Sequence, residues 1–427
     1  MRDLFVTNTV NQVRIHTLKT DKFKTNTIVV NMAYSLEEET ATKLALLPHV
    51  LIRGSKSFPS YKKINEELDL LYGSSIDSFV FKRGEKQVVQ FTLEVPNEKY
   101  LKETEPLLIN AIRLLGDIIA NPNIENNAFQ EEIVESEKKR LENRINGILD
   151  NKIQYAEQKM IESMCQNEKY HIPANGFLKD IKQINGQNLF DFYQDWIRQA
   201  VIDIFAIGEF DDQPFKDSIE FTFKSVSRLE TKIPPNEIDV EITEEKIVID
   251  ELEINQGKLN IGLRTYTSIQ DDDYYSLLMY NGVLGGFSHS KLFVNVREKA
   301  SLAYYASSRL DSHKGILIIQ TGIEIDKFEQ AVEIIKKQLQ ILKEGEITQK
   351  EQEQTKSILI SQMREITDRP RTWIDFTYHS VLSKIDRSIE DVIEGIEKTT
   401  IEDIVAQANK VKLDTIYFLR DKQKEGK

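Results

Sequence analysis

The histidines are the first residues to consider as carriers of chemistry, because their spacing can reveal a metal site. A zinc site built on one helix needs two histidines three or four residues apart, so that both imidazoles face the same ion. The six histidines are His16, His49, His171, His289, His313 and His379. No two of them stand at that spacing, so each is interpreted as an isolated surface or turn residue. The histidine pattern predicts no metal site on this chain.

The glycines and the cysteine do not form a phosphate-binding loop, a disulfide or a zinc site. The glycines of "NGVLGGFSHS", Gly282, Gly285 and Gly286, lack the G-x-x-x-x-G-K-[ST] spacing of a phosphate-binding loop. We expect them to end one helix and to turn the backbone into the next. Cys165 is the single cysteine, so neither an intramolecular disulfide nor a CxxC zinc site can form.

The elements that position these residues alternate between strands and helices in the first half of the chain. Apolar and polar residues alternate over 12–18 and 26–35, which predicts two strands. A helix is expected from about residue 36, and a hairpin over 75–95 with its turn at Arg83-Gly84. Residues 127–164 read as one long helical run.

The second half repeats this order of elements after a stretch with little apolar periodicity around Pro234-Pro235. Such a repeat predicts two tandem homologous α+β domains, each an antiparallel-rich sheet covered by helices. We expect a first domain over 1–222, a linker over 223–247 and a second domain over 248–427.

Composition limits the class of protein further. The chain has 427 residues, 40% of them hydrophobic and 29% charged, which is typical of a globular protein with sizeable cores. A net charge of −13 argues against a nucleic-acid partner, because phosphate binding needs a basic face. No run of 18 apolar residues and no signal-peptide pattern occurs, so we expect a cytoplasmic protein that does not span a membrane.

The most distinctive string is "NGVLGGFSHSKLFVNVREKASLAYYASSRL". It resembles the GG-x-x-x-S-x-L-F-x-x-[VL]-R-E-x-x-x-L-A-Y signature of pitrilysin/insulinase-type peptidases, the inverzincins, which carry H-x-x-E-H in their first half. The resemblance extends over nearly the whole chain, including its two halves and the linker. It implies that the two domains form a clamshell around a peptide-cleaving chamber.

In that family the H-x-x-E-H helix ends shortly before a basic residue and glycine, here Arg53-Gly54 within "HVLIRGS". The resemblance therefore places the second histidine on His49, the glutamate on Pro48 and the first histidine on Ala45. Alanine cannot bind metal, and proline cannot act as the general base. Pro48 also removes a helical hydrogen bond, which predicts a kink in the helix.

The family's third zinc ligand is a glutamate two turns after an auxiliary glutamate. The resemblance places the auxiliary acid on Glu137 and the ligand position on Arg144, whose guanidinium stays protonated and cannot bind zinc. A different register would place Glu135 or Glu142 there, and even then one histidine and one glutamate fall short of three ligands. No cofactor is expected on this chain.

The family's arginine and tyrosine, which anchor the substrate backbone and stabilise the oxyanion, correspond to Arg297 in "NVREK" and Tyr304 in "SLAYY". The alternative is structural: Arg297 pairs with Glu298 or another neighbour, and Tyr304 lies in the core with its hydroxyl bonded. The resemblance favours a retained peptide-contacting pair.

Three hypotheses for function follow. In the first, the chain resembles the processing-peptidase-like subunits that lack the zinc motif: inactive alone, it supplies Arg297 and Tyr304 to a heterodimer whose zinc lies on a homologous partner. The second is an inactive peptide-binding or scaffold protein of the same fold, with a homodimer as the alternative assembly. The third is an active zinc metalloendopeptidase, which requires that the motif lie in another register.

Overall fold

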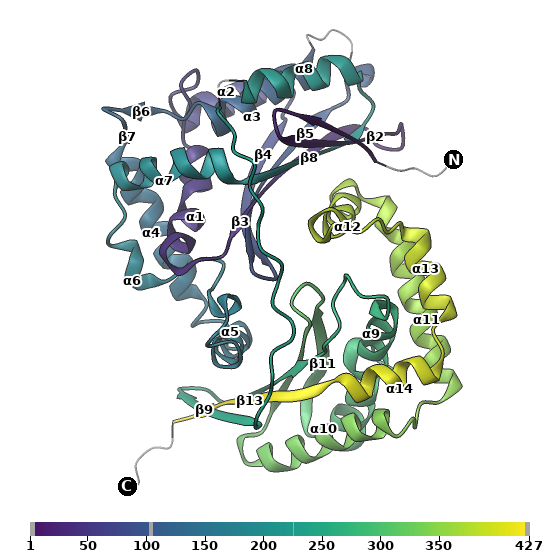
Figure 1. The fold of residues 1–427 in the computed structure, drawn as a ribbon. Coiled ribbons are helices and arrows are strands. Elements are labelled where there is room, and N and C mark those ends of the chain that lie inside the picture. Colours follow the sequence, from purple (N-terminus) through teal and green to yellow (C-terminus); the bar gives the residue numbers. More distant parts are fainter. Residues whose placement is uncertain (1–4, 102–105, 225, 423–427) are drawn as a thin grey trace. The chain divides into compact units, whose positions relative to one another are not determined.

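The structure, a computed structural model, describes residues 5–101, 106–224 and 226–422 and divides into two compact units (Figure 1). Unit 1 contains residues 1–146, 172–235 and 370–374. Unit 2 contains residues 147–171, 236–369 and 375–427. The chain therefore passes between the units several times, and a single cut does not separate them.

Unit 1 is built on a six-stranded sheet. In spatial order its strands are β1 Val6–Val10, β2 Val13–Lys19, β8 Val201–Gly208, β3 Thr25–Ser35, β5 Lys86–Pro96 and β4 Ser75–Arg83. Only β2 and β8 pair in parallel, and the other neighbours are antiparallel. The helices of this part of the chain are α1 Glu38–Leu51, α2 Tyr61–Leu70, α3 Leu107–Ala120, α4 Glu131–Gly147, α6 Leu178–Ile181, α7 Gly186–Gln199 and α8 Asp212–Phe223.

Unit 2 repeats this topology with five strands. In spatial order they are β11 Ala303–Asp311, β12 Ile316–Ile323, β10 Gly257–Arg264, β13 Lys412–Asp421 and β9 Lys246–Leu252. Again only one pair, β9 with β13, is parallel. Its helices are α5 Lys152–Met164, α9 Tyr274–Asn281, α10 Phe328–Lys343, α11 Gln349–Glu365, α12 Pro370–Ser383, α13 Ile389–Lys398 and α14 Ile401–Lys410, of which α12 begins in unit 1. The predicted α+β class, with antiparallel-rich sheets flanked by helices, is confirmed.

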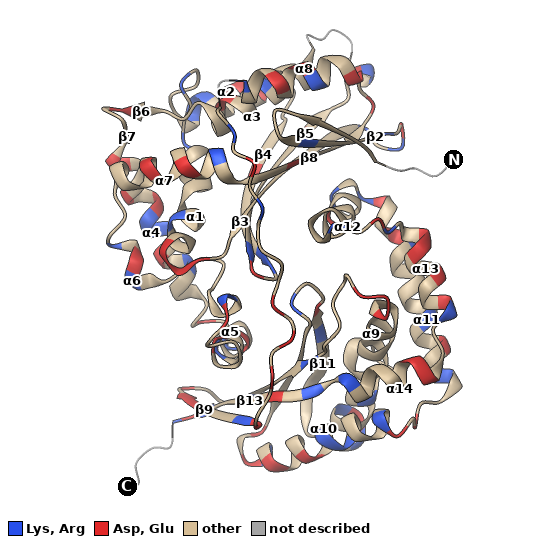
Figure 2. Cartoon of the chain, in the orientation of Figure 1, with Lys and Arg blue, Asp and Glu red and all other residues tan. Residues whose placement is uncertain are grey.

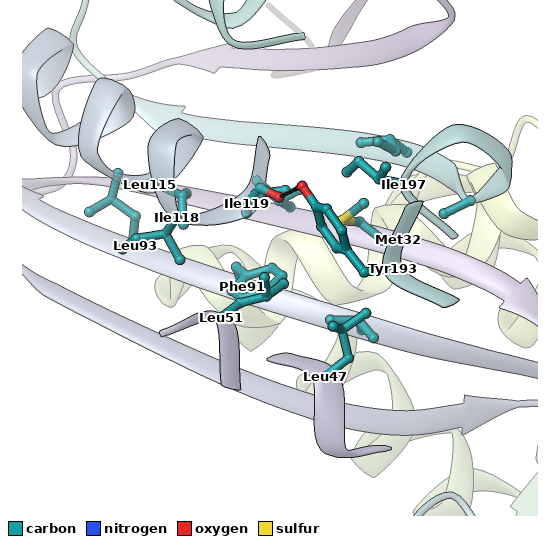
Figure 3. Packing of buried hydrophobic residues seen from close by; sticks show 14 of the residues in the cluster. Met32, Leu47, Leu51, Phe91, Leu93, Leu115, Ile118, Ile119, Tyr193 and Ile197 are labelled. Atoms are coloured by element: carbon teal, nitrogen blue, oxygen red, sulfur yellow. Dashed lines mark hydrogen bonds between the residues drawn. The ribbon is translucent and has the colours of Figure 1, made fainter. Parts of the chain in front are cut away.

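The core of unit 1 holds α1 against the sheet (Figure 3). Leu47 and Leu51 of α1 lie near Phe91 of β5 in a cluster of buried apolar side chains. Tyr193 of α7 crosses the same cluster and donates its hydroxyl to the carbonyl oxygen of Ile119 at 2.9 Å. The helix continues through Pro48 to Leu51, and Pro48, Val50 and Leu51 of its last turn are buried.

Residues 127–164 do not form one helical run, and this expectation is wrong. The run is divided into α4 and α5, because the chain turns after Gly147 and Asn151 begins a new helix by accepting a hydrogen bond from the amide of Gln154. Moreover, α5 packs on β10 and β13 in unit 2, although it precedes the linker in sequence.

Charged residues of both signs are distributed along the helices of both units (Figure 2). Helices that alternate charges on one face and bury apolar residues on the other are typical of elements packed on a sheet. Within the described ranges no helix combines the length and the apolar character needed to cross a bilayer.

Gly176 lies where the loop before α6 meets α1, and it has a positive φ of 67°. A Cβ on this residue would lie 2.4 Å from the Cα and 2.6 Å from the backbone nitrogen of Thr42. We therefore expect Gly176→Ala to lower the free energy of unfolding of unit 1 by about 2 to 4 kcal/mol, since both the backbone conformation and the contact are unfavourable.

Urea denaturation followed by tryptophan fluorescence measures this change, because both tryptophans of the chain, Trp196 and Trp373, belong to unit 1. Gly73→Ala is the matched control: Gly73 lies in the same unit and has a similar φ of 72°, but a Cβ there would meet nothing within 4 Å. A Gly176→Ala protein as stable as the control would contradict the prediction.

Candidate functional site

The last turn of α1 carries the positions that the family resemblance assigns to a metal site. Ala45 and Pro48 are fully buried among apolar neighbours and offer no metal ligand. His49 is partly buried, and its Nε2 lies 2.8 Å from Nη1 of Arg144 on α4. The two elements thus bring together residues 49 and 144, which are far apart in sequence.

The contact between His49 and Arg144 defines the protonation state of the imidazole. A guanidinium can only donate, so Nε2 of His49 accepts and the ring is neutral with its proton on Nδ1. Burial, with the nearby charges of Arg144 and Arg140, lowers the pKa of His49 from 6.5 to about 4. Burial in turn lowers the pKa of Arg144, against the opposing effect of Glu137, but a guanidinium stays charged at neutral pH.

Glu137 lies beside this pair on α4 and is 3% exposed. Its Oε1 is 3.6 Å from Nε of Arg53 and 3.5 Å from Nη1 of Arg140, and it has no hydrogen-bond partner among the described residues. Burial raises the pKa of Glu137, although Arg140, Arg53 and Arg144 each oppose the rise. We call Arg53, Arg140, Arg144, His49 and Glu137 the arginine cluster.

These residues do not fit a zinc ion. A catalytic zinc site takes three protein ligands, whereas here a permanent cation donates to the only histidine. Glu135 pairs instead with Lys138 at 2.6 Å. In the described part of the chain no group of three or more His, Cys, Asp or Glu side chains could hold a metal ion.

Arg53 and Arg140 belong to this site although the sequence predicts a role for neither, since Arg53 only marks the end of the motif on the first helix. The helical spacing could have indicated Arg140. Glu137, Arg140 and Arg144 are spaced three and four residues apart and therefore share one face of α4. The contribution of Arg53 could not be read this way, because it comes from the loop after α1.

Arg297 and Tyr304 both lie in unit 2, on consecutive elements. Arg297 is exposed on the π-helical turn Phe293–Lys299, with its guanidinium 4.6 Å from the ring centroid of Phe293. Tyr304 is 75% exposed. It lies where the pairing of β11 with β12 shifts register between Ala303 and Ala306, and such irregularities re-aim side chains out of the regular pleat. The alternative of a core tyrosine is therefore wrong.

The interpretation of every histidine as an isolated surface or turn residue is also wrong. His16 is buried, and its Nε2 lies 3.0 Å from Oδ1 of Asp203 on β8. Nε2 of the buried His313 lies 2.6 Å from Nδ1 of His379 on α12. Their partners are distant in sequence, so spacing could not reveal them.

The lowered pKa of His49 predicts a stability change with pH. Between pH 6.5 and about 4 the unfolded chain binds a proton at His49 that the folded protein does not, so acid removes stability in that window. From pH 7.5 to 5.5 we expect a loss of about 1 kcal/mol through this group. Urea denaturation of the protein and of His49→Gln at both pH values measures it: the difference between the two proteins should change by that amount, and an unchanged difference would refute the assignment.

Comparison with known proteins identifies the relatives of this fold and site. Residues 183–359 match the family described as "Peptidase M16 inactive domain". The chain is 42% identical to the "Probable inactive metalloprotease YmfF" of Bacillus subtilis, over 95% of each protein. It is 25% identical to the "Uncharacterized zinc protease YmxG" of the same species, over 87% of this chain and 82% of YmxG.

Solved structures agree with these relatives. A conserved protein from Enterococcus faecalis has a TM-score of 0.92 with this chain at 29% identity, covering 99% of this chain and 100% of that one. Together with the matched family, these similarities show that the chain belongs to the M16, or pitrilysin/insulinase-type, peptidase family, as a homologue of its inactive members.

Proposed function

We propose that this chain is the non-metal-binding subunit of a heterodimeric zinc peptidase. Its Arg297 and Tyr304 would contact peptide in a chamber whose zinc lies on a homologous partner chain. The observation that carries the proposal is a contrast within this chain: the guanidinium of Arg144 donates to His49, the histidine that the family resemblance assigns to zinc, while Tyr304 is 75% exposed on β11.

The chemistry of the two exposed residues supports this role. A guanidinium presents several donors in a planar fork and can hold the carbonyl oxygens of an extended peptide. A tyrosine hydroxyl placed near a scissile carbonyl donates to the oxygen as negative charge develops on it. In unit 2 neither Arg297 nor Tyr304 has a hydrogen bond or an ion pair to another described residue, so both donor sets are available.

The relatives add a second line of support. Bacillus subtilis holds both a probable inactive metalloprotease and an uncharacterized zinc protease that are similar to this chain. A genome with one relative of each kind is what a division of labour between two subunits requires.

The experiment is to purify the chain alone, its zinc-protease homologue alone, and the two after co-expression. We expect a complex by size-exclusion chromatography and cleavage of quenched fluorescent peptides well above that of either chain alone. A homologue that is fully active alone and forms no complex would refute the proposal. Binding of peptides by this chain without any effect on cleavage would instead identify the peptide-binding or scaffold alternative, and zinc in the isolated chain would identify the peptidase alternative.

A further inference from the structure

The arginine cluster holds more positive charge than its own carboxylate neutralises. Arg53, Arg140 and Arg144 surround one buried carboxylate, Glu137, and the imidazole of His49 is neutral. Two positive charges are therefore left uncompensated, in a protein whose net charge is −13.

The donors of two of these arginines reach solvent. Arg144 is exposed and uses Nη1 on His49, and no other hydrogen bond of its guanidinium is found among the described residues. The side chain of Arg140 is 60% exposed, and its one ion pair with a described residue is that with Glu137, at 3.5 Å. Because the two residues are four apart on α4, their guanidinium groups extend from the same face of the helix.

An arginine pair of this kind matches an anionic ligand with oxygen acceptors. Guanidinium groups bind carboxylates in bidentate, charge-assisted hydrogen bonds. A guanidinium cannot act as a Lewis acid, as a metal cation at this place in an active relative would. A guanidinium can, however, bind an anionic group. His49 contributes by accepting from Nη1 of Arg144, which fixes the orientation of the fork.

We propose that the arginine cluster is a carboxylate-binding site, with Arg144 and Arg140 as the residues that contact the ligand. The ligand is a carboxylate of a peptide, either its C-terminus or an aspartate or glutamate side chain. The peptide nature of the ligand rests on the proposed function. Arg53 and Glu137 act through the others: Glu137 holds Arg53 and Arg140 in place from its buried position.

The test uses the full chain without any partner and measures binding, not cleavage, so that it is independent of the heterodimer. Four N-terminally fluorescein-labelled pentapeptides of otherwise neutral sequence serve as probes. One ends in a free carboxylate and one in a carboxamide; the other two are carboxamides with one internal glutamate or glutamine. Fluorescence anisotropy gives the affinity of each at low and high salt.

We expect at least one carboxylate peptide to bind roughly tenfold or more tightly than its uncharged twin, and high salt to reduce the difference. The peptide pair that shows this difference identifies whether the site binds a C-terminal or a side-chain carboxylate. Arg144→Gln and Arg140→Gln should each remove most of the preference, and Arg144→Lys should keep only part of it, because lysine retains the charge without the fork. The matched control is Arg113→Gln, which removes an exposed arginine from α3 in the same unit.

Three results would overturn the proposal: no measurable binding of any probe, equal binding of charged and uncharged twins, or a preference that survives Arg144→Gln and Arg140→Gln. If Arg144→Gln fails to fold, the largely exposed Arg140 still provides a decisive variant.

Discussion

Replacing Arg264 by methionine should lower the free energy of unfolding of unit 2 by about 3 to 5 kcal/mol, because it leaves buried charges without their partner. Arg264 is 1% exposed on β10. Its Nη1 and Nη2 donate to the two carboxylate oxygens of Glu168 at 2.9 and 2.6 Å, and its Nε donates to Asp414 at 2.8 Å.

The substitution affects the ion pairs of Glu168 and Asp414 differently. Glu168 would keep an ion pair with the buried Lys314 at 2.6 Å, whereas Asp414, whose side chain is 13% exposed, would lose its salt bridge with Arg264. Nη2 also donates to the carbonyl oxygen of Met164 at 3.2 Å, at the end of α5. The substitution therefore removes the charge that compensates the two acids, and it also removes a hydrogen bond that attaches α5 to the sheet.

Far-UV circular dichroism and tryptophan fluorescence separate this effect from unfolding of unit 1. Trp196 is buried in unit 1, whereas Trp373 lies on α12, most of which belongs to unit 2. In a Trp373→Phe background, the Arg264→Met protein should therefore show a loss of helix signal at a lower urea concentration than its fluorescence change. The control is Arg309→Met on β11, which removes an arginine with a 59% exposed side chain from its ion pair with Glu157 and should cost at most about 1 kcal/mol. Equal stability of the two variants would show that the buried network contributes nothing.

Substituting Tyr304 by phenylalanine should lower kcat of the proposed heterodimer by roughly a hundredfold, the usual cost of one donor to a developing oxyanion. The change removes one hydroxyl from a residue that is 75% exposed, so it should leave the fold and the assembly of the subunits intact. Arg297→Ala should raise KM as well, because the guanidinium is assigned to the substrate backbone.

The neighbouring tyrosine provides a control. Tyr305 lies in the same irregular stretch of β11 but is partly buried, and burial raises its pKa to about 12. Tyr305→Phe makes the same chemical change one residue away and should leave kcat within about twofold of the unmodified complex, a change far too small for a lost oxyanion donor. If Tyr304→Phe behaves like Tyr305→Phe, Tyr304 is not the oxyanion donor.

Local patterns in the sequence predicted much of the fold. The strand over 26–35 and the hairpin over 75–95 correspond to β3 and to β4 with β5, because strand-forming residues and a glycine turn are properties of neighbouring residues. The two-fold repetition of strand order also follows the repeat in the sequence, and in each sheet the strand that comes last in the chain, β8 or β13, forms the parallel pair.

Long-range electrostatics could not be predicted in this way. Arg264 meets Glu168 and Asp414, residues 96 and 150 positions away, and nothing in the local sequence of β10 marks it as buried and paired. The same holds for His313 with His379. The proximity of His49 and Arg144, in contrast, was accessible through the family resemblance, although the surplus of arginines around Glu137 became visible only when Arg53 was placed beside α4.

The membership of α5 in unit 2 has a consequence for biosynthesis. A ribosome releases α5 before any strand of the unit 2 sheet exists, and β13, one of the two strands that α5 covers, is completed last, at Asp421. Met160 and Met164 of α5, which are buried in the folded protein, lack their final cover until β13 has been made. Unit 2 can therefore complete its folding only after β13 has left the ribosome, and α5 stays open to chaperones during that interval.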